Sequence, residues 1–127
     1  MARNRMIKPE FWSSETLNSI SLESNLFFIG LWNFADDYGV LLDNDRQLLG
    51  NIFPYRENIS AEDIKKWKKE LIEKQLLVPI TIKKKNLLII KSWFEHQKVP
   101  NPSKRSYLCN PSKDNIAQLI RKNLESN

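Results

Sequence analysis

The sequence predicts an α+β fold that is mainly helical and contains a small three-stranded antiparallel sheet. Two long segments, residues 21–39 and 60–74, have the composition and spacing of helices. Two short apolar runs, 76–82 and 86–93, flank three lysines, and a third apolar run, 40–42, precedes them in the chain. We divide the 127 residues into an N-terminal arm with a short helical clip (1–20), a folded domain (21–95), and a Pro/Lys-rich linker with a C-terminal helix (96–127).

The first part of the chain predicts a short helical turn followed by a central helix. Pro9 suits a first helical turn, and we expect Phe11 and Trp12 to pack onto the domain. Ser21 is a suitable N-cap for the next segment, which is apolar on nearly every face. Such a pattern predicts a buried helix, which we expect to end at Gly39 as a left-handed C-cap.

A short strand and a short helix are expected next. The run Val40–Leu42 is apolar and begins with a β-branched residue, so it predicts a three-residue strand. Either Asn44 or Asp45 can cap the helix that follows, and Pro54 ends it after two to three turns.

The second long helix is the better defined one. Ser60 and Asp63 resemble a capping box, although Asp replaces the usual Glu or Gln. The helix should continue to about Lys74, with apolar residues on one face at Ile64, Trp67, Leu71 and Ile72. Its polar face carries four lysines, Lys65, Lys66, Lys68 and Lys69.

The two apolar runs after this helix predict a hairpin whose tip is Lys83, Lys84 and Lys85. Pro79 has no backbone N–H, so its strand belongs at an edge and the following strand in the centre. The order helix, strand, helix, helix, hairpin is that of a winged helix-turn-helix domain. In this arrangement the helix at 60–74 occupies the recognition position and the three lysines form the tip of the wing.

The composition changes after Trp93, where three prolines and many polar residues predict a linker. Residues 114–124 regain a helical pattern, and we expect that helix to dock either on the domain or on a partner. The apolar positions of this pattern are Ile116, Leu119, Ile120 and Leu124.

Charge is distributed unevenly and indicates a polyanionic partner. The net charge is +5, yet residues 1–60 carry five basic and eight acidic side chains, whereas residues 61–127 carry fifteen and seven. A basic face on a recognition helix and wing is typical of duplex DNA binding, although the same lysines also suit a solvated surface or a blocked sheet edge. Arg3 and Arg5 are either an arm that follows a DNA groove or part of a disordered terminus.

Lysine, unlike Arg, Asn or Gln, is a point charge without a planar fork for reading bases. We therefore expect contacts mainly to phosphate, with modest base readout. If about five to seven lysines contact phosphate, the log–log salt slope should be roughly −4 to −6. The predicted DNA-binding residues are Arg3, Arg5, Lys65, Lys66, Lys68, Lys69, Lys83, Lys84 and Lys85.

The sequence does not favour an enzyme, and we expect no catalytic residues, metal or cofactor. The single histidine, His96, has no spaced general-base partner, and with Cys109 it matches no zinc spacing; with Gln97 it is instead suited to hydrogen bonds at the exit from the wing. Asp36 and Asp37 lie at a helix end, where turn hydrogen bonds or ion pairs are the simpler role. One cysteine allows no internal disulfide, and no run is long enough for a membrane span or signal peptide, so we expect an intracellular protein.

Four segments resemble the N-terminal winged-helix domain of bacteriophage replisome organisers and related DnaD-like replication-initiation proteins. They are ARNRMIKPEFW at the start, LFFIGLWNFADDYGVL, NIFPY, and WFEHQKVPNPSKRSYL after the wing. The resemblance implies binding to replication-origin DNA in the host cytoplasm, recruitment of host replication proteins and assembly as a homo-oligomer. Larger relatives continue into a helicase-loading or partner-binding region, which this chain does not match. Two alternatives stay open: a protein-interaction or oligomerisation module of the replication machinery, and a transcriptional regulator.

Overall fold

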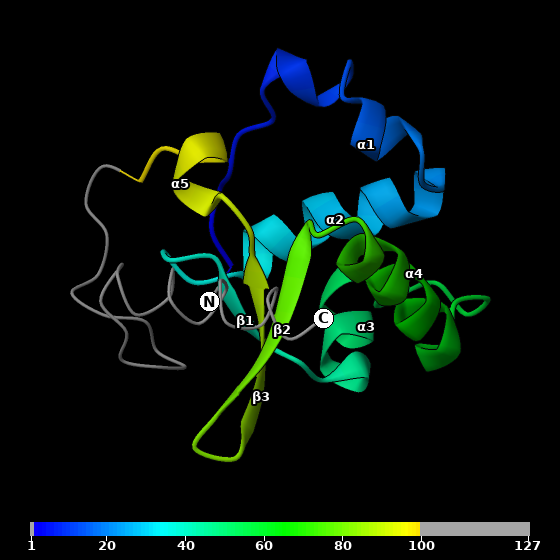
Figure 1. Cartoon of the computed structure of the whole chain (residues 1–127). Helices are drawn as coiled ribbons and strands as arrows, with labels where there is room; N and C mark the ends of the chain where they lie inside the picture. Colours follow the sequence, from blue (N-terminus) through cyan, green and yellow to red (C-terminus); the bar gives the residue numbers. More distant parts are fainter. Residues whose placement is uncertain (1, 100–127) are drawn as a thin grey trace.

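The computed structural model of the chain describes residues 2–99, and these form an α+β, winged-helix-like fold (Figure 1). The predicted C-terminal helix at 114–124 lies outside the described residues. The elements are a 3-10 turn Pro9–Phe11, α1 Glu15–Asn18, α2 Leu22–Phe34, β1 Val40–Leu42, α3 Asp45–Ile52, α4 Ala61–Glu73, β2 Leu77–Ile82, β3 Lys85–Ile90 and α5 Trp93–His96.

The sheet has the strand order β1-β3-β2, with both pairs antiparallel. The prediction of a central second hairpin strand is therefore confirmed, as is the strand at 40–42. Pro79 lies on β2, an edge strand, where its missing N–H removes no hydrogen bond from a central ladder.

Local capping explains where three helices begin. The Ser21 side chain accepts a hydrogen bond from the Ser24 N–H, and Asn44 accepts one from Gln47. At α4, Ser60 and Asp63 form the predicted capping box, with the Ser60 N–H 2.9 Å from an Asp63 carboxylate oxygen. These side chains accept or satisfy N–H groups that lack partners within the helix.

The end of α2 differs from the prediction. The helix stops at Phe34, because Ala35 is extended, and Gly39 is not its C-cap. Gly39 instead lies in the turn before β1 with φ +77°, and a Cβ there would come within 2.7 Å of the Trp93 ring. The glycine is thus required by a turn and a close approach, five residues beyond the last residue of the helix.

The main core lies between the sheet and α2, α3 and α4, which Figure 1 shows together at one side of the sheet. Trp67 of α4 lies at its centre, with ring centroids 5.6 Å from Phe53 and 6.1 Å from Phe27. This packing places α3 and α4 against each other as the two helices of a helix-turn-helix.

Three apolar side chains that we expected to be buried are exposed. Leu22 and Leu26, one turn apart on α2, are 82% and 58% exposed, and Trp12 is 65% exposed. Phe11 alone of the two predicted aromatics packs on the body, 5.6 Å from the Trp32 ring. Helix α2 is therefore buried on one side only, in spite of its apolar composition.

A short helix that we did not predict, α5, follows the wing at the end of the predicted domain, and only its last residue, His96, falls in the expected linker. Gln97 is buried and pairs with the backbone of Met6: its side-chain oxygen accepts from the Met6 N–H at 3.0 Å, and its amide donates to the Met6 carbonyl at 2.9 Å. Residues just beyond our predicted domain boundary thus hold the N-terminal segment. Within residues 2–99, no helix has both the length and the apolar character needed to cross a bilayer.

Candidate nucleic-acid interface

The wing tip is a two-residue turn made of lysines. Lys83 and Lys84 have φ of +50° and +67°, and Lys85 begins β3. Two consecutive positive φ values match the tight hairpin turn that normally contains Asn-Gly. All three lysines are exposed, and none forms an ion pair with another residue of the described range 2–99. Figure 1 shows this loop projecting beyond the body of the domain.

Helix α4 presents three of its four predicted lysines to solvent. Lys65, Lys66 and Lys69 are exposed, on the side of the helix away from Trp67. Lys65 forms an exposed i,i+3 ion pair with Glu62 at 3.3 Å, which contributes little and can be exchanged for another anion. This face therefore has three cations available for an external partner.

Lys68 differs from its neighbours. Its ammonium nitrogen lies 2.7 Å from a carboxylate oxygen of Asp43 and 2.6 Å from one of Asp45, and its side chain is only 16% exposed. The Asp43 N–H in turn donates to the Asn86 carbonyl of β3, next to Lys85, at 2.9 Å. Lys68 thus joins α4 to the start of α3 and to β3. It is therefore poorly placed for the DNA contact that we predicted for it.

Burial lowers the pKa of Lys68, but the hydrogen bonds and charges of Asp43 and Asp45 outweigh this effect and raise the pKa above its ordinary value. The ammonium is therefore charged at neutral pH. The three groups together carry a net charge of −1, so the space between wing and α4 is not itself attractive to phosphate.

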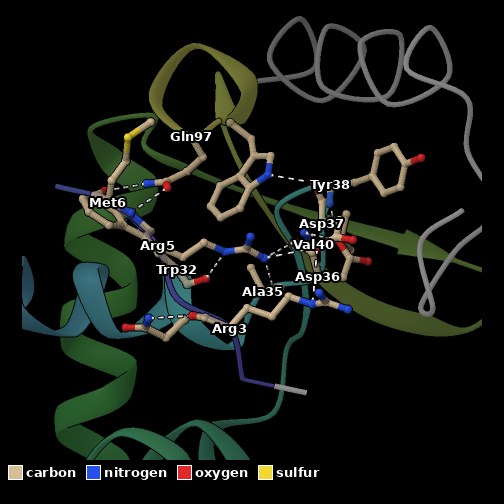
Figure 2. Close-up of polar contacts among 12 residues, drawn as sticks. Arg3, Arg5, Met6, Trp32, Ala35, Asp36, Asp37, Tyr38, Val40 and Gln97 are labelled. Carbon is tan, nitrogen blue, oxygen red and sulfur yellow. Dashed lines mark hydrogen bonds and ion pairs between the residues drawn. The ribbon is translucent and has the colours of Figure 1, made fainter. Parts of the chain in front are cut away.

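The N-terminal arginines also have roles within the fold (Figure 2). The Arg5 guanidinium donates to the carbonyls of Trp32, Ala35 and Asp36 at 3.1–3.2 Å, lies 4.9 Å from the centre of the Trp93 ring, and is 7% exposed. Burial lowers the Arg5 pKa, an effect that Asp37 partly offsets. Arg5 therefore satisfies carbonyls at the end of α2 instead of following a DNA groove.

Arg3 is anchored beside it, and the expected disorder of this terminus is not what the structure shows. Its backbone N–H donates to the Asn33 carbonyl at 2.8 Å, and the Asn33 side chain donates back to the Arg3 carbonyl at the same distance. The Arg3 side chain is about half exposed and lies 3.5 Å from Asp37. Asp36 accepts from the N–H groups of Tyr38 and Val40 at 2.8 and 3.0 Å, the turn role we predicted for it.

The structure thus separates the nine predicted residues into two sets. Six lysines are exposed on the wing and on α4, whereas Lys68, Arg3 and Arg5 have partners within the fold. Arg46, which the sequence analysis did not single out, is exposed in the first turn of α3. A single arginine forms no pattern in the sequence. Only the helix-turn-helix order, which places α3 before the recognition helix, could have drawn attention to Arg46.

Across residues 2–99, no three His, Cys, Asp or Glu side chains are grouped so as to hold a metal ion. His96 is exposed at the end of α5, and the hydrogen bonds to Met6 come from Gln97.

Comparisons with known proteins add one structural neighbour. No family model and no curated protein sequence matches the chain. A solved structure described as the N-terminal domain of a DNA binding protein is similar, with 16% sequence identity and a TM-score of 0.48. The match covers 94% of this chain and 86% of the other.

Proposed function

We propose that this protein binds double-stranded DNA, without enzymatic activity, through the lysines of the wing and of α4. The observation that carries the proposal is the wing tip, where three exposed lysines without ion-pair partners in residues 2–99 lie on a projecting hairpin. Phosphate contacts from such side chains supply most of the affinity in non-specific DNA binding.

The conformation of the tip strengthens this argument. A non-glycine residue in the left-handed region costs on the order of 1 kcal/mol, and both Lys83 and Lys84 adopt it. Asn-Gly would form the same turn with less strain. Lysine at both positions thus makes the turn less stable than Asn-Gly would, but places two positive charges at the most projecting point of the hairpin. This is expected if these charges contact a ligand.

The α4 lysines extend the positive surface beside the wing. Lys65, Lys66 and Lys69 face outward on the helix that holds the recognition position. None of them can read a base edge through a planar fork, so the contacts should depend little on sequence. Six phosphate contacts predict a log–log salt slope of roughly −5.

The experiment is DNA binding measured by fluorescence anisotropy over a salt series, with the double variant Lys83→Asn/Lys84→Gly. This variant removes two charges and relieves the strained turn, so it should fold at least as stably as the wild type. We expect weaker binding to every duplex tested and a salt slope less negative by about 2, because each phosphate contact contributes about 0.9.

The matched control is Lys91→Gln/Lys98→Gln, which removes the same charge at the other end of β3 and beyond. It should leave the slope nearly unchanged. Equal loss in both double variants would show that net charge alone drives binding. Unchanged binding by the Asn-Gly variant, or no binding to any duplex at about 50 mM salt, would refute the proposal.

The finer role that we propose, in the initiation of phage DNA replication, is supported by the resemblance of four sequence segments. That role would add host replication proteins and self-association to the list of partners. Light scattering at several concentrations, with and without duplex, tests the self-association directly: a monomer under all conditions would remove the oligomer from the proposal.

A second candidate function is a protein-interaction module. It is favoured by Leu22 and Leu26, which form an exposed apolar pair one turn apart on α2. Such a pair would suit a second copy or a partner protein. A chain that associates with protein and shows no salt-dependent DNA binding would fit this function and not the first.

A further inference from the structure

Thr81 and Asn86 form a polar pair immediately behind the lysine tip of the wing. The two residues lie directly opposite each other on β2 and β3, and the Thr81 hydroxyl donates to the Asn86 side-chain oxygen at 3.0 Å. Both side chains are exposed, so the pair does not serve to satisfy a buried polar group. Asparagine is also depleted in strands, where β-branched and aromatic residues pair better. The stability of the hairpin therefore does not require this pair.

The hydrogen bond fixes the direction of the Asn86 amide. Because the side-chain oxygen accepts from Thr81, the amide nitrogen points away from Thr81 and carries two N–H donors. Across residues 2–99 this nitrogen has no hydrogen-bond partner. The neighbouring ammonium groups of Lys83, Lys84 and Lys85 are donors as well, so the end of the hairpin presents mainly hydrogen-bond donors.

Asn86 faces the side of the sheet on which α3 and α4 lie (Figure 1). Successive side chains of a strand alternate between its faces, and Leu88 and Ile90 of the same strand point into the core beneath the helices. Asn86 belongs to that set, and its carbonyl accepts from Asp43, whose carboxylate holds Lys68. The amide thus lies beside charges that do not attract phosphate, where a neutral donor suits a base edge better than a phosphate oxygen.

This pattern of donors matches one surface of duplex DNA. In the minor groove an A·T pair presents only acceptors, adenine N3 and thymine O2, whereas a G·C pair adds the amino donor of guanine. In the major groove every base pair mixes acceptors with a donor. Runs of A·T pairs also have a narrow minor groove with a strong negative potential, which favours inserted lysines. A two-residue turn is a narrow end for a hairpin, so side chains at the tip can reach into a groove about 6 Å wide.

We propose that Asn86 is a specificity-determining residue, which donates to base edges in the minor groove and makes the protein prefer A·T-rich duplexes. Thr81 is a positioning residue for the same contact, because it holds the amide with its N–H groups directed outward. This role rests on the proposed DNA binding and adds to it: the lysines supply affinity without sequence preference, and Asn86 supplies the preference.

The test compares three duplexes of one length, made of A·T, G·C or inosine·cytosine pairs, by fluorescence anisotropy. Inosine lacks the guanine amino group in the minor groove but keeps the major-groove edge of guanine. We expect the A·T and inosine·cytosine duplexes to bind equally, and about three- to tenfold more tightly than the G·C duplex, as one neutral hydrogen bond predicts. In Asn86→Ala the preference should disappear, while the affinity for the G·C duplex and the salt slope stay the same because no charge is lost.

Three further variants separate the amide from other effects. Asn4→Ala is the matched control, since it removes an exposed asparagine of the N-terminal segment, and it should keep the full preference. Thr81→Val removes the hydroxyl at nearly constant shape and should weaken the preference. Thr81→Ser retains the hydroxyl and should restore it; equal preference in the valine and serine variants would overturn the positioning role of Thr81.

Equal binding of the three duplexes with the expected salt slope would overturn this inference and leave the proposed DNA binding standing. No binding to any duplex would refute both. An A·T preference that the inosine·cytosine duplex does not share would place the contact in the major groove. A preference that survives in Asn86→Ala would assign it to the shape of the groove. Either of these two results would overturn the role of Asn86.

Discussion

Replacing Lys68 with methionine should destabilise the protein, although Lys68 lies in a row of lysines of which the others face solvent. Methionine keeps much of the length of the side chain and removes the charge. The change leaves Asp43 and Asp45 without the ammonium that now lies 2.7 and 2.6 Å from their oxygens. Two carboxylates at the start of α3 then face each other without a counter-charge.

The magnitude follows from the burial of the three groups, each of which is between 16% and 20% exposed. Fully exposed ion pairs contribute about 0.2–1 kcal/mol, and removal of one partner of a buried pair costs about 3–5 kcal/mol. Two partly buried pairs lie between these limits, so we expect a loss of about 2 kcal/mol in the free energy of unfolding. For a domain of this size the midpoint of thermal unfolding should fall by about 8–16 °C.

Urea and thermal unfolding of Lys68→Met and Lys69→Met provide the comparison. Lys69 is exposed on the same helix, so its removal should change the stability by less than about 0.5 kcal/mol. A double-mutant cycle with Asp43→Asn should give a coupling of about 1 kcal/mol to Lys68 and none to Lys69. Equal stability of the two methionine variants, or no coupling to Asp43, would refute the assignment of Lys68 to the fold.

The pH dependence gives an independent check of the same contact. The pKa of Lys68 is raised in the folded state, so its contribution is complete below the ordinary lysine pKa of about 10.4 and is lost as the pH rises through the folded value. Wild-type protein should therefore lose more stability above about pH 10 than Lys68→Met does.

Three further variants test other features of the fold. Hydrogen bonds from Ser24 and Ser21 lower the pKa of Glu70, so the contribution of Glu70 to stability is complete above the ordinary glutamate pKa of about 4.3 and is lost as the pH falls below it. The thermal midpoint of Glu70→Gln should therefore decline less between pH 6 and pH 3 than that of the wild type. An equal decline would contradict the contact. Gly39→Ala should lower the free energy of unfolding, measured with urea, by about 1–3 kcal/mol, because it combines a positive φ with a clash. Gly50→Ala, in open space within α3, should instead raise the free energy of unfolding by about 0.5–1 kcal/mol. The reverse order of stability would contradict this account.

Much of the architecture could be predicted because it depends on short-range signals. The capping box at Ser60 sets the start of α4, and the three-residue spacing of its partners is visible in the sequence. Pro79 likewise restricts its strand to an edge wherever the chain folds, because the missing N–H is a covalent property. The order of elements then sufficed to place the wing.

The end of α2 and the burial of its faces could not be predicted in the same way. Gly39 has the positive φ that suits a C-cap, yet Phe34 ends the helix, because the residues that follow it turn back toward β1 and Trp93 packs on the glycine. Leu22 and Leu26 have the composition of core residues, but no described element packs over them. An apolar side chain favours burial, but its identity does not determine which neighbouring element buries it.

The sequence by itself determined the main helices and strands, their order and the lysine-rich segments, since these depend on covalent structure and local periodicity. Only the tertiary structure decided which cations are available to a partner. Lys68 and Lys69 are adjacent in sequence, but Lys68 meets Asp43 and Asp45, which lie more than twenty residues earlier in the chain. Arg5 likewise meets the carbonyls at the end of α2 from about thirty residues away. Ion pairs are short-range contacts in space between residues distant in sequence, so a charge pattern alone cannot distinguish a free lysine from a paired one.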